Sequence, residues 1–127
     1  MKKLFLGAMA LIAAVTLVAC GSKKDAYESI KENKKLVVAV SPDYAPFEFK
    51  TLVDGKDQVV GSDIKLAQAI ADELGVKLEV TTMSFDNVLS SLQAGKADIA
   101  ISGISVTDER KKTFDFSDPY YETQNAI

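Results

Sequence analysis

The sequence contains no histidine and only one cysteine. Without histidine there is no Ser–His or Cys–His nucleophilic pair, no histidine general base and no histidine metal ligand. A single cysteine excludes an internal disulfide framework. The formal net charge is −3, so the chain does not have the excess of basic residues that is typical of a nucleic-acid-binding protein. We therefore expect no metal and no nucleic-acid partner.

What remains is the composition of a globular protein. The 127 residues are 47% hydrophobic and 26% charged, which is too apolar for a disordered chain and too charged for a polytopic membrane protein. The length is that of one ordinary domain.

Residues 1–19 have the organisation of an export signal. Lys2 and Lys3 form a positively charged start, residues 4–18 are uncharged and mostly apolar, and small residues follow. The alternative is a transmembrane helix, but a span needs ~20 apolar residues and this run is shorter. We expect residues 1–19 to be a signal peptide.

The end of this signal carries the only cysteine. The residues 17–20, Leu-Val-Ala-Cys, resemble a bacterial lipobox. This resemblance implies cleavage before Cys20 and attachment of acyl chains such as palmitate to it, which would anchor the protein stably in a membrane. The polar, lysine-rich residues 20–35 then predict a flexible tether, with room for a short helical turn.

The rest of the chain alternates between strand and helix patterns. Continuous or alternating apolar runs predict strands over 36–40, 76–82 and 98–101, and Asp54-Gly55 predicts a turn within a hairpin over 47–60. Helices are expected from Ser62 or Asp63 to Gly75, from Ser84 to Gly95, and over 108–112 after the cap Thr107. This order predicts an α/β domain with a mostly parallel sheet.

The usual signatures of catalysis and of cofactor binding are absent. The chain has neither a GxxxxGK[ST] run nor a GxGxxG run. Residues 103–107 begin like a nucleophile elbow, but Thr107 stands where a glycine is needed. The carboxylates are scattered, without EF-hand spacing. We expect no cofactor and no enzymatic activity.

The ends of the predicted strands carry residues suited to binding a small amino acid. In open α/β sheets ligands bind beyond the carboxyl ends of the strands. Tyr44 and Phe85 offer flat apolar faces, and Gly103 allows close approach to the backbone. Ser105 offers a hydroxyl near a helix start, and Arg110 can hold a carboxylate with two parallel hydrogen bonds.

Each of these residues also has an ordinary structural explanation. Arg110 lies among charged neighbours and would usually be a solvated surface residue. Phe85 has the helical spacing of a core residue, and Tyr44 could pack a loop. Ser102 and Ser105 could serve as turn or capping residues. The sequence pattern by itself leaves these alternatives open.

Two segments give the chain a family resemblance. Residues 103–112, GISVTDERKK, and 116–121, FSDPYY, resemble the solute-binding proteins of polar amino-acid ABC importers. Residues 44–49 and 61–63 also fit, and the resemblance covers about residues 35–125. It implies a type II periplasmic-binding-protein fold, in which two α/β lobes close on a ligand.

The resemblance also implies roles for individual residues. Arg110 would bind the ligand α-carboxylate with help from Ser105, and the Ser102–Gly103 position would offer carbonyls or a hydroxyl to the α-ammonium. Tyr44 and Phe85 match the aromatic pair that encloses the ligand side chain.

The sequence departs from the family pattern in two respects. Ser41 replaces an aspartate that reads the ligand side chain in many members. The chain is also much shorter than the family usually is. We therefore expect residues 36–127 to form only the first lobe, with the second lobe missing, and to bind amino acids weakly or not at all alone.

The implied function is that of an extracytoplasmic, lipid-anchored, monomeric receptor that delivers a polar amino acid to an ABC permease. Two alternatives share the scaffold: the ligand-binding domain of a sensory receptor, and an enzyme such as a dehydratase. Sites rather than folds distinguish them.

Overall fold

The computed structural model describes residues 25–123. The expected signal peptide, the expected lipidation site Cys20 and the last four residues lie outside the described residues. Among the described helices, none is long and apolar enough to cross a membrane.

The central sheet has three parallel strands in the order β5-β1-β6. Its middle strand β1 (Lys35–Val40) pairs along its whole length with β5 (Lys77–Thr82) and more briefly with β6 (Ile99–Ala100). Most of β1 is buried, as expected for an apolar strand between two covered faces of a sheet. The prediction of a mostly parallel α/β sheet is confirmed.

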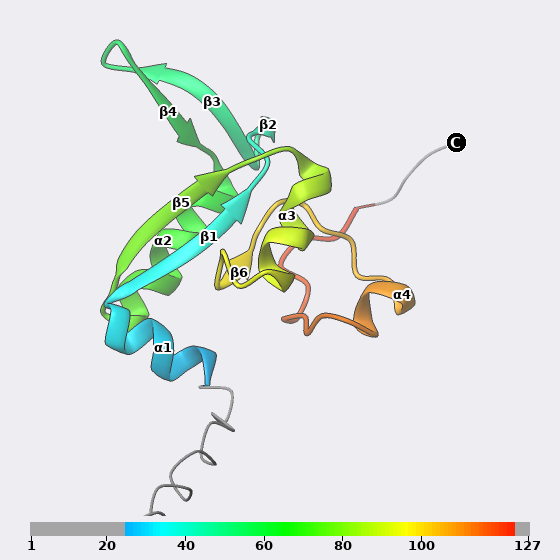
Figure 1. The fold of residues 1–127 in the computed structure, drawn as a ribbon. Helices are drawn as coiled ribbons and strands as arrows, with labels where there is room; N and C mark the ends of the chain where they lie inside the picture. Colours follow the sequence, from blue (N-terminus) through cyan, green and yellow to red (C-terminus); the bar gives the residue numbers. More distant parts are fainter. Residues whose placement is uncertain (1–24, 124–127) are drawn as a thin grey trace, which may run out of the picture.

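Two helices cover the opposite faces of this sheet (Figure 1). Helix α2 (Ser62–Leu74) packs Ala67 and Ala71 against the even-numbered side chains of β1, while Val88 of α3 (Phe85–Gln93) packs with Ala39. The division follows from the alternation of side chains along a strand. Both helices follow the predicted pattern, although the N-cap of α2 is Gly61 and not Ser62 or Asp63.

An antiparallel sheet extends from one end of the domain. It joins β2 (Asp43–Tyr44), β3 (Glu48–Val53) and β4 (Lys56–Val60), and its hairpin projects away from the central sheet in Figure 1. The turn residues Asp54 and Gly55 both have positive φ, which matches the twist of a tight hairpin. The predicted hairpin is confirmed.

The expected flexible tether is wrong for its described part. Residues Ala26–Asn33 form helix α1, and Ile30 is buried in the core with β1 and α2. Asp25 caps the helix by accepting a hydrogen bond from the Tyr27 amide, and the Lys31 ammonium donates to the Leu74 carbonyl at the end of α2. The buried Ile30, the Asp25 cap and the contact of Lys31 with the end of α2 hold in place a segment whose polar composition predicts a flexible tether.

The end of the described chain is irregular. The short helix α4 (Asp108–Lys111) starts at Thr107, whose hydroxyl accepts a hydrogen bond from the Arg110 amide, as predicted. The following segment has no helix or strand up to residue 123 but returns to the domain. Tyr121 packs edge-on against Phe47, with ring centroids 4.9 Å apart.

Candidate functional site

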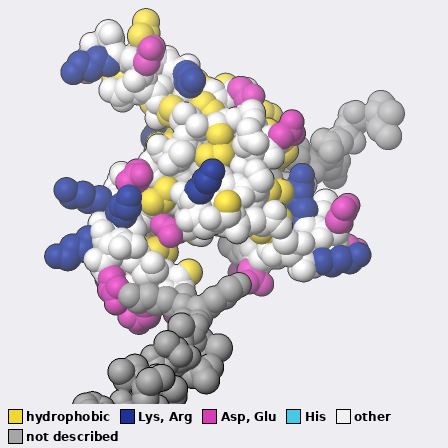
Figure 2. All heavy atoms as spheres, viewed as in Figure 1, with side chains coloured by type: hydrophobic (Ala, Val, Ile, Leu, Met, Phe, Trp, Pro, Cys, Tyr) yellow, Lys and Arg dark blue, Asp and Glu magenta, His cyan; other side chains and the backbone are white. Residues whose placement is uncertain are grey.

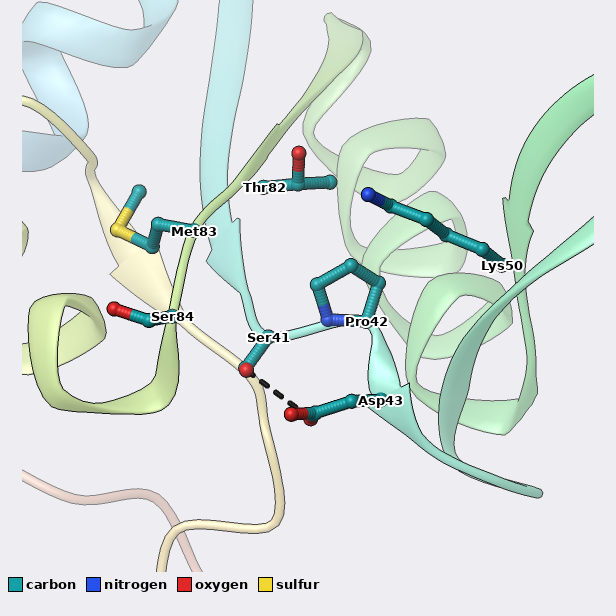
Figure 3. A pocket seen from close by; sticks show the side chains of 7 residues that line it. All are labelled: Ser41, Pro42, Asp43, Lys50, Thr82, Met83 and Ser84. Atoms are coloured by element: carbon teal, nitrogen blue, oxygen red, sulfur yellow. Dashed lines mark hydrogen bonds between the residues drawn. The ribbon is translucent and has the colours of Figure 1, made fainter.

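A pocket of about 340 Å³ lies at the carboxyl ends of β1 and β5 (Figure 3). Its lining residues come from the end of β5 and the loop after it, from the segment between β1 and β2 with the first residue of β2, and from β3: Ser41, Pro42, Asp43, Lys50, Thr82, Met83 and Ser84. This is the edge at which an open parallel sheet places its ligands. The pocket therefore adjoins the predicted site residues Tyr44 and Phe85, which follow Asp43 and Ser84 directly in the chain.

The pocket contains one acidic and one basic side chain. The Ser41 hydroxyl donates a hydrogen bond of 3.1 Å to Asp43 Oδ1, which fixes the carboxylate at the rim. Lys50 enters from β3, and its ammonium end points toward Thr82 in Figure 3. Figure 2 shows lysine, arginine and acidic side chains mixed over the visible face, with no large patch of one sign of charge.

The structure brings Tyr44 and Gly103 together. Gly103 has φ +55°, and a Cβ at this position would lie 3.0 Å from the Tyr44 ring. The ring stacks on Phe47 with a centroid distance of 5.2 Å and is 51% exposed. A flat, accessible aromatic face therefore lies directly beside backbone that carries no side chain, as a site for a small ligand requires.

Phe85 is not a core residue. It is the first residue of α3, directly after the pocket residue Ser84, and 42% of it is exposed. The core contact of this helix is made by Val88 instead. The structure thus removes the ordinary packing explanation for Phe85 and leaves its ring at the same sheet edge as the pocket.

Arg110 and Ser105 form a second local unit. One Arg110 Nη1–H donates a hydrogen bond of 2.9 Å to the Ser105 carbonyl, which ties the side chain back to the loop before α4. Arg110 is half-buried, unlike the exposed Lys111 and Lys112 beside it. A guanidinium has five N–H donors, so several remain for a carboxylate. None of the contacts described for these two residues reaches Phe85.

The Ser102 hydroxyl serves the interior of the domain. Ser102 is buried; its Oγ accepts a 2.9 Å hydrogen bond from the Ser41 amide and donates one of 2.7 Å to Glu48 Oε1. Of the two groups that the resemblance implies for the ligand ammonium, backbone carbonyls or a hydroxyl, the hydroxyl is thus already hydrogen-bonded within the domain. The backbone carbonyls of Ser102 and Gly103 remain the groups expected to face the ligand ammonium.

Sequence reasoning missed an acidic cluster below the site. Glu48 and Asp63 are only 1% and 0% exposed, and the Tyr120 hydroxyl donates a 3.0 Å hydrogen bond to Asp63 Oδ2. Burial raises the pKa of Glu48 to about 7; the Ser102 hydroxyl opposes the rise, and Asp63 and Asp43 add to it. The hint in the sequence was Glu48 itself, a charge between Phe47 and Phe49 in an alternating strand.

The match to a family model now decides the relationship. The model for bacterial extracellular solute-binding proteins, family 3, matches residues 36–127. The chain belongs to this family. The matched range contains every predicted ligand-site residue and all elements after α1 except the first residue of β1.

Individual relatives agree with this assignment. The arginine-binding extracellular protein ArtP of Bacillus subtilis is 42% identical over the whole chain, which covers 48% of ArtP. A probable histidine-binding protein of Neisseria gonorrhoeae is 37% identical over the whole chain, which covers 47% of that protein. The chain thus spans about half the length of the curated relatives it matches.

Solved structures identify the described residues as one lobe of the type II periplasmic-binding-protein fold. An amino acid ABC transporter substrate-binding protein from Streptococcus pneumoniae, bound to L-arginine, matches 78% of this chain and 41% of its own length, with 74% identity and a TM-score of 0.77. The arginine-bound domain 1 from TmArgBP matches 73% of this chain and 71% of its own length, with 45% identity and a TM-score of 0.68. The predicted fold, a single lobe, is confirmed.

Proposed function

We propose that this chain provides the lobe of an extracellular solute-binding protein that captures a cationic amino acid, with L-arginine as the first candidate, for an ABC importer. The observation that carries the proposal is the shared sheet edge, where the Tyr44–Gly103 contact and the Asp43 pocket come together. Arg110, held by Ser105, supplies the carboxylate-binding group in the same chain segment. Relatives at 42% and 74% identity are named for arginine or carry it.

The arrangement suits the three parts of an amino acid. Arg110 binds the α-carboxylate through its free N–H donors, because a planar guanidinium matches a carboxylate with two parallel hydrogen bonds. The carbonyls of Ser102 and Gly103 accept from the α-ammonium. The side chain lies between Tyr44 and Phe85, and Asp43 faces its cationic end.

A single lobe is enough to bind ligand in a related case. Domain 1 from TmArgBP is a structure of one domain with arginine bound. This weighs against the expectation that one lobe binds weakly or not at all. We infer that the present chain binds L-arginine measurably, while capture between two lobes would strengthen binding.

Calorimetric titration of the chain with L-arginine tests the proposal. Agmatine, which lacks the carboxylate, and L-citrulline, which lacks the side-chain charge, are the matched ligands. We expect heat of binding with L-arginine and weaker binding of both analogues. Equal affinity for agmatine would overturn the carboxylate role of Arg110, and equal affinity for L-citrulline would overturn the cationic preference.

We further propose that the protein is a binder rather than an enzyme. A cyclohexadienyl dehydratase of Pseudomonas aeruginosa is 38% identical over 91% of this chain, so a dehydratase is the specific competing function. Incubating the chain with a cyclohexadienyl carboxylate and following the absorbance of an aromatic product separates the two. A catalytic rate above background would contradict the proposal.

The remaining proposals concern location and partners. The protein is held as a monomer at the outer face of the cell membrane by lipid on Cys20 and delivers its ligand to an ABC permease. Membership of an extracellular family supports this location. Uptake of labelled L-arginine by cells with and without the gene tests delivery, and unchanged uptake would argue against it.

A further inference from the structure

Two carboxyl groups lie close together in the interior of the domain, next to the candidate ligand site. Glu48 comes from β3 and Asp63 from the first turn of α2, and neither is more than 1% exposed. Glu48 Oε1 accepts from Ser102, and Asp63 Oδ2 accepts from Tyr120. The other oxygens, Glu48 Oε2 and Asp63 Oδ1, are buried and lack a donor. Buried acceptors left in this way are costly.

A proton resolves this arrangement. A proton on Glu48 Oε2 would turn this oxygen into a donor, for which the unpartnered Asp63 Oδ1 is an acceptor on the neighbouring carboxyl group. Hydrogen bonding between the Glu48 and Asp63 side chains is among the effects that raise the pKa of Glu48. Two like charges at one buried site cannot both ionise cheaply, so the pair retains one proton.

The pair also connects to the parts of the site that hold ligand. Ser102 links Glu48 to the turn that contains Gly103, and Tyr120 links Asp63 to the segment whose next residue, Tyr121, packs on Phe47. Hydrogen bonding with the Gly103 backbone lowers the pKa of Tyr120, against the rise that burial causes. The two carboxyl groups are thus linked by hydrogen bonds both to the Ser102–Gly103 turn and to the Tyr120–Tyr121 segment.

We propose that Glu48 and Asp63 share a single proton and that this protonated pair positions the Ser102–Gly103 turn and the Tyr120 segment for ligand binding. Glu48 and Asp63 act as positioning residues, because they reach the ligand site only through Ser102 and Tyr120. The role in binding rests on the proposed function, whereas the shared proton does not.

The surroundings determine the pH range of the effect. The charged groups that act on Glu48 are Asp63 of α2 and Asp43 of β2, both acidic, and the phenol of Tyr120 faces Asp63. The pKa of Glu48 rises from 4.5 to about 7 on folding. Since the folded state holds this proton more tightly than the unfolded chain, stability from the pair is present below about pH 4.5, falls as the pH rises to about 7, and is then constant.

Glu48→Gln is the variant that separates the proton from the contacts. The glutamine amide can donate to Asp63 and its carbonyl can accept from Ser102, so the hydrogen bonds remain but the titration is gone. We expect the wild-type melting temperature to fall more steeply than that of Glu48→Gln between about pH 4.5 and about pH 7. Parallel profiles would overturn the shared proton.

A direct measurement keeps the proposal testable if the variant folds poorly. Infrared difference spectra of the wild-type chain should show the carbonyl stretch of a protonated carboxyl group that disappears as the pH passes about 7. As a second variant, Ser102→Ala removes the donor that favours the charged form, so the titration should move to higher pH. No protonated carboxyl group near neutral pH would refute the pair.

Ligand affinity provides the functional test. If only the protonated pair holds the Ser102–Gly103 turn in its binding position, the affinity for L-arginine should fall by up to about tenfold per pH unit above about pH 7. Glu48→Gln should bind with a pH-independent affinity over the same range. If both proteins show the same pH profile, the positioning role is wrong; if L-arginine binds at no pH, the proposed function fails while the unfolding profiles still decide the shared proton.

Discussion

At the scale of single residues, Arg110 is the side chain on which amino-acid binding should depend most. Arg110→Ala removes charge-assisted hydrogen bonds worth ~1.5–3 kcal/mol each, so we expect the affinity for L-arginine to fall by about tenfold or more. Arg110→Lys keeps the charge but loses the planar fork and should recover binding only in part. Calorimetry measures both effects.

Lys112→Ala is the matched control for Arg110. It also removes a positive charge beside α4 but lies exposed, so its affinity should be close to that of the wild type. A similar loss in the control would show that general electrostatic attraction, and not a carboxylate contact, holds the ligand.

Gly61 should be the least replaceable glycine of the described residues. A Cβ there would lie 2.0 Å from the Phe47 carbonyl oxygen, and its φ of +132° disfavours any side chain. The close approach brings the start of α2, and with it Asp63, against the residues that directly precede β3. Gly61→Ala should cost more than ~1 kcal/mol of unfolding free energy in urea titration.

Gly75 provides the comparison for Gly61. It also has positive φ, but a Cβ there meets no atom within 4 Å. Gly75→Ala therefore carries the conformational penalty without the collision and should destabilise less than Gly61→Ala. Equal losses would mean that backbone conformation alone explains the requirement at residue 61.

At the scale of elements, helix α1 should act as part of the domain. Ile30→Ala removes the buried contact of α1 with the core, and we expect a loss of about 2 kcal/mol in unfolding free energy, at the low end of the range for buried isoleucine because the helix lies at the edge. Thermal and urea unfolding measure the change.

Tyr27→Ala is the control within the same helix. Tyr27 is 51% exposed, so its removal should change stability little. If Ile30→Ala is as stable as this control, helix α1 does not contribute to the stability of the domain, as expected for a tether.

At the scale of the whole molecule, the proposed attachment to a membrane depends on one residue. Cys20→Ala should shift the protein from the membrane fraction to the soluble fraction of the cell, because it removes the proposed lipid attachment site. Immunoblots of the fractions measure this. Ser22→Ala, outside the lipobox-like residues, should remain at the membrane, and an unchanged distribution of Cys20→Ala would contradict lipid anchoring.

Local patterns in the sequence predict the strands of the central sheet, the hairpin, the helices α2 to α4 and the class of the fold. The buried strand at 36–40, the Asp54-Gly55 turn and the Thr107 cap are local signals, because side-chain periodicity and backbone preference act over a few residues. These signals predicted the central strands, the hairpin and α4 correctly. The segments near Gly103 and Tyr120 also carried the family resemblance.

Only the tertiary structure decided which side chains meet. Glu48 and Ser102 are 54 positions apart, and Asp63 and Tyr120 are 57 apart, yet both pairs are hydrogen-bonded. No local pattern in the sequence indicates such contacts. Asp63 has the sequence position of a helix cap, but in the structure the N-cap of α2 is Gly61 and Asp63 is buried in the first turn. The same holds for Ile30, whose burial depends on the face that β1 and α2 offer. The burial and the hydrogen-bond partners of a polar group depend on segments that are distant in the sequence, so they are fixed only when those segments pack against each other.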